Sequence, residues 1–231
     1  MADTLETRSL RGRRLFKDRK DAGELLAGCL AEYRDKNVIV LGIPRGGVPV
    51  AAEVARGLNA DMDIIVARKL GSPVSAELAI GAVTANGGCY LNDEIIRELQ
   101  VSDEYIDRVT ETQREDARQR EERFRGARSA PVLTGRVVIL VDDGLATGAT
   151  MRAAVRSVRK AEPARLVVAV PVAPPQTCAE LREEADEVVC PYQPDPFWAI
   201  GLFYGDFEQV EDEEVSGLLE EFAQKSATTV G

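Results

Sequence analysis

Short apolar runs recur along the middle of the chain, and helical spacing fills most of the segments between them. The runs are rich in Val and Ile, and they cover residues 38–41, 63–67, 137–141, 166–171 and 187–190. Runs of this length and composition are typical of strands that are buried on both faces. The alternation over residues 38–190 therefore predicts an α/β fold with a doubly wound, mostly parallel sheet.

Apolar or small positions three or four apart predict the helices. A first amphipathic helix follows Phe16 and continues to Tyr33, whereas residues 1–12 are polar and are expected to be loose. Further helices are expected after the strands, at 48–55, from 151 onward and at 174–185.

Residues 76–127 interrupt this alternation. Segments 77–83 and 88–91 predict a hairpin that turns at Asn86-Gly87, and Ser102 marks the start of a helix. That helix is almost entirely charged from residue 110 to 125, which predicts an element outside the core that is solvated or makes polar contacts with a partner. We expect this insertion to act as a cap or as the arm of a homodimer.

Composition removes several classes of function. The chain has 231 residues, a net charge of −10 and no histidine. The absence of histidine excludes Ser-His and Cys-His nucleophile pairs and zinc sites that use imidazole. The negative charge argues against a general nucleic-acid binder, although a local nest of amides and arginines can still hold a phosphate.

Two further features of composition concern location. The four cysteines are far apart in sequence and form no Cys-x-x-Cys, which favours free thiols and a reducing cytoplasm. No apolar run is long enough to span a bilayer, so we expect no membrane association.

The stretch 137–150 carries the strongest chemical signal. An apolar strand ends in Asp142 and Asp143, and a loop of small residues and hydroxyls then leads into a helix. This arrangement places an anion on backbone N–H groups at a helix N-terminus. A carboxylate cannot hold a phosphate, so the two aspartates should face sugar hydroxyls or a metal. The alternative is a buried strand whose acids cap the next helix, but capping requires one acceptor rather than two.

Two other loops follow predicted strands. Residues 42–47 place Arg45 among glycines, whose amides can point at an anion, although an ordinary tight turn would look the same. Arg68 and Lys69 follow the predicted strand 63–67, which would put a basic pair at the ligand edge of the sheet.

The motifs together resemble those of type I phosphoribosyltransferases. Residues 137–150 resemble that family's signature for 5-phosphoribosyl 1-pyrophosphate (PRPP), which combines an apolar run, Asp-Asp and Thr-Gly-x-Thr. Residues 42–47 resemble its pyrophosphate loop, in which one peptide is often cis, and Arg68-Lys69 resembles the start of the mobile loop in adenine-specific members. Phe-x-Asp-Arg at residues 16–19, together with the loops, is similar to a stand-alone microbial subgroup without an assigned acceptor.

This resemblance implies Mg²⁺-dependent transfer of the phosphoribosyl group from PRPP to a nitrogenous base, with release of pyrophosphate, as in nucleotide salvage. Asp142 and Asp143 would be the catalytic positions and would hold the ribose hydroxyls. The 5′-phosphate would lie on Ala146, Thr147, Gly148, Ala149 and Thr150. Pyrophosphate and Mg²⁺ would face Arg45, Gly46, Gly47, Arg68 and Lys69.

The aromatic segment 191–210 allows two interpretations: it plugs an edge of the core, or it is a lid that stacks on a ring. It resembles the hood of hypoxanthine-guanine phosphoribosyltransferases. By position, Trp198 matches the base-stacking aromatic, with Ala199 beside it, and Asp206 matches a metal-linked aspartate with one residue inserted. Ala146 and the sequence at 170–173 depart from those enzymes and disfavour 6-oxopurines.

The resemblance implies a single domain over residues 1–231, with its core at 16–190, the insertion at 76–127 and the hood at 191–210. Two other functions remain open. One is a regulator that binds PRPP or a nucleotide without turnover, and the other is a hydrolase of a phosphorylated sugar.

Overall fold

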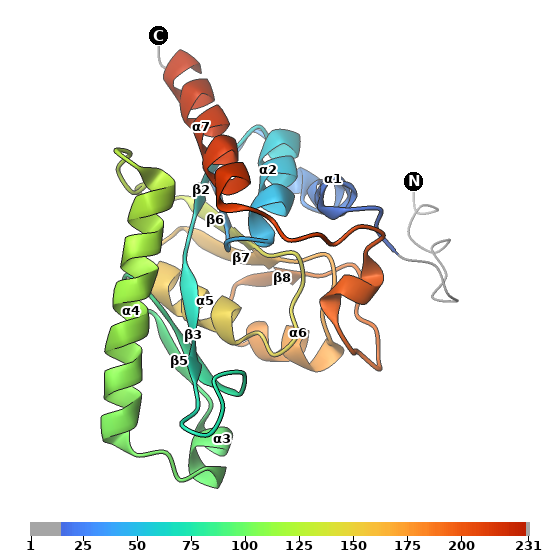
Figure 1. The fold of residues 1–231 in the computed structure, drawn as a ribbon. Helices are drawn as coiled ribbons and strands as arrows, with labels where there is room; N and C mark the ends of the chain where they lie inside the picture. Colours follow the sequence, from blue (N-terminus) through green and yellow to red (C-terminus); the bar gives the residue numbers. More distant parts are fainter. Residues whose placement is uncertain (1–14, 230–231) are drawn as a thin grey trace.

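The computed structural model describes residues 15–229 and contains two sheets (Figure 1). The larger is a five-stranded parallel sheet in the order β2-β1-β6-β7-β8. Its strands are β1 (Val38–Gly42), β2 (Asp61–Ile64), β6 (Val137–Val141), β7 (Arg165–Ala169) and β8 (Glu187–Val189). The α/β fold with a mostly parallel sheet is therefore confirmed.

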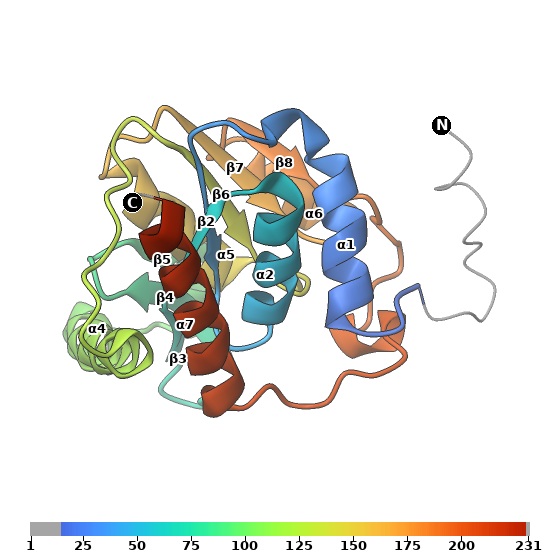
Figure 2. The same cartoon turned by 90° about the horizontal axis from the view of Figure 1, so that it is seen from above.

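Alternate side chains of each central strand enter different cores. Val38 and Val40 face a core formed with α1 (Arg19–Cys29), α2 (Gly47–Leu58) and α7 (Asp212–Thr229). Ile39 and Leu41 face a second core formed with α5 (Ala149–Arg159) and α6 (Pro175–Leu181). Helices thus cover both faces of the sheet (Figure 2), which explains why its strands are apolar at every position.

The smaller sheet is antiparallel and has the order β3-β4-β5. Its strands are β3 (Ala67–Gly71), β4 (Ala79–Thr84) and β5 (Cys89–Leu91). The predicted hairpin is confirmed as β4 and β5. The predicted strand 63–67 is wrong, because β2 ends at Ile64 and a new strand begins at Ala67. Arg68 and Lys69 therefore lie within β3, paired with Val83 and Ala82, and not at the end of a parallel strand.

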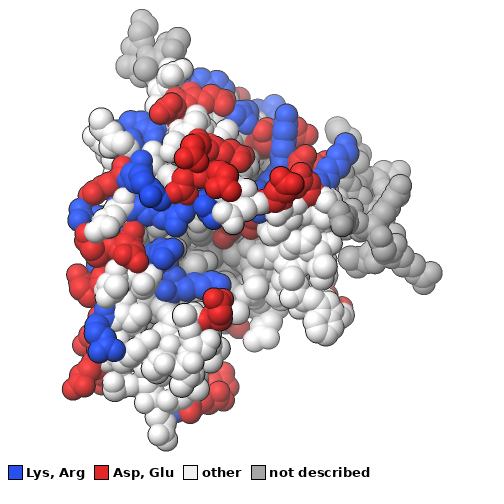
Figure 3. Space-filling view, in the orientation of Figure 1, with Lys and Arg blue, Asp and Glu red and all other residues white. Residues whose placement is uncertain are grey.

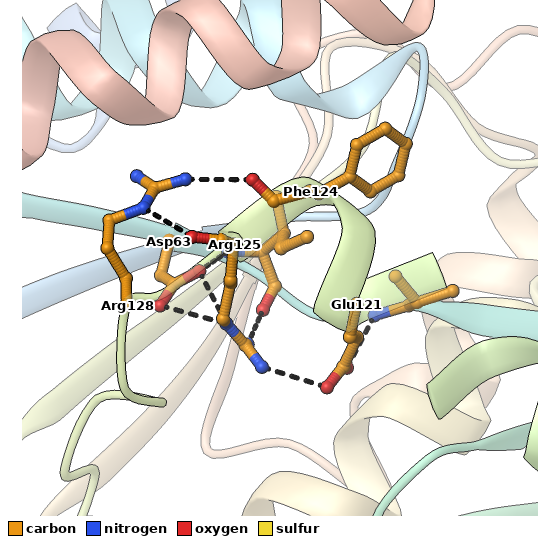
Figure 4. Close-up of polar contacts among 7 residues, drawn as sticks. Asp63, Glu121, Phe124, Arg125 and Arg128 are labelled. Carbon is orange, nitrogen blue, oxygen red and sulfur yellow. Dashed lines mark hydrogen bonds and ion pairs between the residues drawn. The ribbon is translucent and has the colours of Figure 1, made fainter. Parts of the chain in front are cut away.

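The helix α4 (Asp103–Arg125) follows the short helix α3 (Asp93–Glu98) and starts at the predicted cap, where the Ser102 hydroxyl accepts the Tyr105 N–H. Its assignment as an element outside the core is wrong at its C-terminal end. There Arg125 donates to both Asp63 and Glu121, and Glu121 in turn accepts the Val66 N–H (Figure 4). Phe124 is buried in the core beside α7. A charged helix end thus joins β2 to β3.

The first described residues pack against segment 192–207 at one side of the sheet. Phe16 forms a parallel bridge with Tyr204, and both rings are buried with aromatic residues from 192–207. Short 3₁₀ turns occur at Ala31–Tyr33 and Ile200–Phe203. The predicted loose segment 1–12 lies outside the described residues. Within them, no helix is both long and apolar enough to cross a bilayer.

Candidate functional site

The acidic pair lies where the carboxyl ends of β1 and β6 meet. These strands pair in parallel, so the loop after Gly42 and the loop after Val141 leave the sheet side by side. The Ile43 N–H donates to the Val141 carbonyl at 2.9 Å, which ties the two loops together. The predicted pyrophosphate loop and the predicted PRPP loop are thus neighbours at one edge.

The two carboxylates repel each other and lie largely out of contact with water, since Asp143 is buried and Asp142 is half-buried. Burial, followed by the charge of Asp143, raises the pKa of Asp142 well above its usual value. Burial also raises the pKa of Asp143, although the nearby Arg19 guanidinium counteracts this effect. The Asp142 carboxylate accepts the Asp143 N–H at 2.9 Å. Raised carboxylate pKa values that come from burial and a like charge are typical of functional sites.

Arg19 is a residue of the site that the sequence did not assign. Its Nε donates to Asp143 at 2.9 Å, and its Nη1 donates to the Glu208 carbonyl at 2.8 Å. The guanidinium also lies 4.0 Å from the centre of the Phe207 ring. Arg19 therefore links the acidic pair to the hood. The basic character of the segment before residue 20 was the feature of the sequence that could have indicated this role.

Tyr204 holds the backbone of the acidic pair. Its hydroxyl donates to the Asp143 carbonyl at 2.6 Å, and its ring is almost fully buried. Burial raises the pKa of this hydroxyl, with Asp143 adding to the effect, so the group remains a proton donor. Because Tyr204 lies 61 residues beyond Asp143, no local pattern indicated this contact.

The loop 144–148 wraps the start of α5. Gly148 caps the helix with a φ of +69°, a conformation that glycine adopts without steric cost. The Ala146 carbonyl accepts the Thr177 hydroxyl at 2.8 Å, which fixes the loop against α6. Ala146 and Thr147 are exposed, and Thr150 is half-buried. The first N–H groups of a helix have no intrahelical partner, so this loop presents donors to an anion.

Two glycines allow the pyrophosphate loop to approach the acids. A Cβ at Gly46 would lie 2.0 Å from an Asp143 carboxylate oxygen, and one at Gly47 would lie 2.8 Å from Asp142 Cα. The peptide between Pro44 and Arg45 is cis. The Arg45 guanidinium turns away from the acids and donates to Asp212, at the start of α7, over 3.4 Å.

The two basic residues of β3, Arg68 and Lys69, have different neighbours. The Lys69 charge lowers the pKa of Asp142, so this lysine lies near the acidic pair. It also lines a cavity of about 570 Å³ together with Thr150 of α5 and Tyr105 of α4. Arg68 lines the same cavity but points toward α4, where its guanidinium lies 3.9 Å from Asp116. Basic side chains gather at the hollow beside α4 in Figure 3.

One part of the hood packs as a plug of the core, and another part is exposed, as a lid that stacks on a ring would be. Phe197, Phe203 and Phe207 pack around buried Tyr204, as a core plug requires. Trp198 does not, because it is 80% exposed, and Ala199 beside it is also exposed. Ile200 returns to the site, and a Cβ at Gly144 would lie 2.7 Å from its side chain. The hood therefore lies directly on the residue after the acidic pair.

A metal would find few ligands from the protein alone. Among residues 15–229, no three acidic or cysteine side chains are placed to hold an ion together. Asp206 is exposed on the hood, and its carboxylate accepts the Glu208 N–H. Asp206 and Arg19 line one cavity, and Arg19 also donates to Asp143 of the acidic pair. Such a donor set suits Mg²⁺ that keeps water and substrate phosphate oxygens as its other ligands.

Comparisons with known proteins agree with this geometry. The family model of the phosphoribosyl transferase domain matches residues 17–206. A protein of Mycobacterium tuberculosis H37Rv, whose name proposes a phosphoribosyl transferase, is 44% identical over 218 residues. That match covers 93% of this chain and 49% of the mycobacterial protein, so the chain spans about half the length of the curated relatives it matches.

Solved structures show the same fold. The crystal structure of TT1426 from Thermus thermophilus is 45% identical and superposes with a TM-score of 0.76, covering 90% of this chain and 98% of that one. A hypothetical protein from Neisseria gonorrhoeae, solved with bound ppGpp, is 15% identical with a TM-score of 0.50. It covers 88% of this chain and 92% of its own, and it supports the fold alone.

Proposed function

Because the chain belongs to the phosphoribosyl transferase domain family, we propose that it is a Mg²⁺-dependent enzyme that transfers the 5-phosphoribosyl group from PRPP to a nitrogenous base. One observation carries this proposal. The acidic pair, the helix-capping loop 144–148 and the glycines at 46 and 47 meet at one edge of the parallel sheet. Ligands of open α/β sheets bind at this edge.

Each part of the edge suits one part of PRPP. The donors of residues 146–150 at the start of α5 would bind the 5′-phosphate. Asp142 and Asp143 would accept hydrogen bonds from the ribose hydroxyls, since ionised carboxylates are acceptors only. The amides at Gly46 and Gly47, together with Lys69, would face the pyrophosphate, and Arg68 would join them from β3.

Catalysis would rest on position and charge. The bond from C1 of the ribose to pyrophosphate breaks while a ring nitrogen of the base forms the new bond, and positive charge develops on the ribose. The buried carboxylates beneath the ribose would stabilise that charge, and the basic groups would stabilise the departing pyrophosphate. No covalent nucleophile is needed.

When bound, Mg²⁺ would supply positive charge to the pyrophosphate oxygens. Asp206 is the protein carboxylate that would contact it or its water, in line with its place on the hood.

Trp198 and Ala199 would contact the base. An exposed indole beside a binding edge offers a flat apolar surface, and stacking of a base on an aromatic ring contributes about 1–3 kcal/mol. Ala146 and the apolar segment 170–173 after β7 offer no polar side chain to a 6-oxo group, so the acceptor is expected to be a base other than hypoxanthine or guanine. Free thiols at the four cysteines suit a reducing cytoplasm.

Calorimetric titration with PRPP tests the proposal. Asp142→Asn with Asp143→Asn should keep the fold and lose PRPP binding, as should wild-type protein in excess EDTA. Arg68→Ala with Lys69→Ala should weaken binding through the lost cations. Asp103→Asn with Asp107→Asn removes the same charge from the exposed start of α4 and is the matched control. PRPP affinity that is unchanged in the first double variant would refute the site.

A further inference from the structure

A second basic cavity lies beside the PRPP edge, on the side of α4. Its volume is about 310 Å³, and it is lined by Arg68, Asp116, Gln119, Arg120 and Arg123. Four of these residues come from α4, and Arg68 comes from β3. The cavity contains none of the residues that would hold the ribose or the 5′-phosphate, and of those that would face the pyrophosphate it contains Arg68 alone.

The charges in and around this cavity do not balance. Arg120 donates to Asp212 at 3.0 Å, and Arg123 and Arg45 also pair with the same carboxylate. The fourth arginine, Arg68, has Asp116 as its acidic neighbour at 3.9 Å, beyond hydrogen-bond distance. Four arginines thus face two aspartates, which leaves a net charge of +2 on a protein whose net charge is −10.

Arg68 also has an unused donor. Its Nε is buried and has no hydrogen-bond partner. A buried donor without a partner costs free energy, and a ligand oxygen would remove this cost. The Arg68 guanidinium, which lines the cavity, therefore has a donor left for an anion.

We propose that Arg68, Arg120 and Arg123 form a second anion site, which binds a chain of two or more phosphoryl groups. The cavity presents guanidinium groups from two elements, and an oligophosphate chain offers several oxygens to such planar groups, which bind phosphate in pairs of hydrogen bonds. The chain is either inorganic or the phosphate tail of a nucleotide.

Asp212 is the internal counter-ion of this site. It pairs with Arg120, Arg123 and Arg45, so a phosphate chain must displace it. Because Arg45 belongs to the pyrophosphate loop and Asp212 starts α7, occupation of the site would free Arg45 and couple α4 and α7 to the PRPP edge.

The test is calorimetric titration with inorganic tripolyphosphate and, in a second arm, adenosine triphosphate. Arg120→Ala with Arg123→Ala should lower the affinity for both by tenfold or more. Arg108→Ala with Arg118→Ala removes two exposed arginines from the same helix and should leave affinity unchanged, since neither lines the cavity. Arg68→Ala should weaken binding without touching the contact between α4 and α7, which separates ligand loss from local unfolding.

The remaining variants separate this proposal from the proposed function. Asp212→Asn should bind tripolyphosphate more tightly, since the internal competitor loses its charge. Asp142→Asn with Asp143→Asn should bind it as the wild type does, even though PRPP binding is lost. Adenosine triphosphate that binds where tripolyphosphate does not would identify a nucleotide as the ligand. Equal tripolyphosphate affinity in the wild type and in Arg120→Ala with Arg123→Ala, or weaker binding in Asp212→Asn, would overturn the second site.

Discussion

The contact between Gly46 and Asp143 allows a sharp test of how the site is assembled. In Gly46→Ala the new Cβ would lie 2.0 Å from an Asp143 carboxylate oxygen, whereas ordinary van der Waals contact begins at 3.4 Å. The carboxylate must retreat by the difference, about 1.4 Å, and it is the same oxygen that accepts the Arg19 Nε–H at 2.9 Å. The substitution should therefore break the link between the acidic pair and the hood.

The size of the effect follows from these contacts. Asp143 and Arg19 are both largely buried, and a hydrogen bond to a charged group contributes about 1.5–3 kcal/mol. Overpacking costs about 1–3 kcal/mol, and the two effects overlap because the same displacement causes both. We expect a loss of about 2–3 kcal/mol in the free energy of unfolding. At about 2–4 °C per kcal/mol for a chain of this size, the melting temperature should fall by about 4–12 °C.

Gly28→Ala is the matched control. Gly28 lies on the exposed side of α1, and a Cβ there meets no atom within 4 Å. Alanine in a helix interior is favoured over glycine by about 0.5–1 kcal/mol, so this variant should be neutral or slightly more stable. Thermal unfolding followed by circular dichroism, with PRPP calorimetry on the same samples, separates the two variants. If Gly46→Ala matched Gly28→Ala in both stability and PRPP affinity, the arrangement of Arg19, Asp143 and the pyrophosphate loop would be wrong.

Three further variants test the acidic pair and the hood. Asp142→Asn keeps the acceptor for the Asp143 N–H. Because the pKa of Asp142 is raised in the folded protein, the stability of the wild type falls as pH rises through that pKa. In urea unfolding the variant should therefore be the more stable protein at neutral pH, and this advantage should disappear below the pKa of Asp142 in the unfolded chain. An advantage that grew as pH fell would contradict this sign. Tyr204→Phe should lose about 1–3 kcal/mol of stability in urea unfolding, because the Asp143 carbonyl stays buried without its donor. An unchanged midpoint of the urea transition would refute this prediction. Trp198→Ala should change the free energy of unfolding by no more than about 0.5 kcal/mol, since the side chain is exposed. It should weaken the binding of a nucleoside monophosphate by about tenfold, or ~1.4 kcal/mol, with PRPP affinity retained. If the variant bound the nucleotide as the wild type does, Trp198 would not belong to the site.

Local patterns were enough to predict the core of the sheet and its loops. The runs at 38–41 and 137–141 are continuous and β-branched, because those strands are covered on both faces, and such runs have few other interpretations. The hairpin of β4 and β5 was visible from its Asn-Gly turn. The start of α4 was equally local, since the cap at Ser102 lies within three residues of the N–H it accepts.

The wrong and the missing predictions concern contacts between residues that are distant in sequence. Arg68 and Lys69 looked like the end of a parallel strand, but the chain turns at residues 65 and 66 into a second sheet whose partner comes later. Arg19 reaches Asp143 across 124 residues, and Arg45 reaches Asp212 across 167. A charged helix surface does not reveal that Glu121 and Arg125 are buried partners of β2 and of the residue before β3. The helix α7, which was not predicted, supplies the counter-ion of Arg45.

The measurement that tests the central claim most directly is PRPP-dependent release of pyrophosphate across a panel of nitrogenous bases in the presence of Mg²⁺, with the nucleotide product identified by mass. We predict release with at least one base other than hypoxanthine or guanine, formation of its nucleoside 5′-monophosphate, and loss of both in Asp142→Asn with Asp143→Asn. Release of ribose 5-phosphate without any base would instead show a hydrolase. Tight PRPP binding with no turnover across the panel would contradict a transferase and show a protein that only binds PRPP.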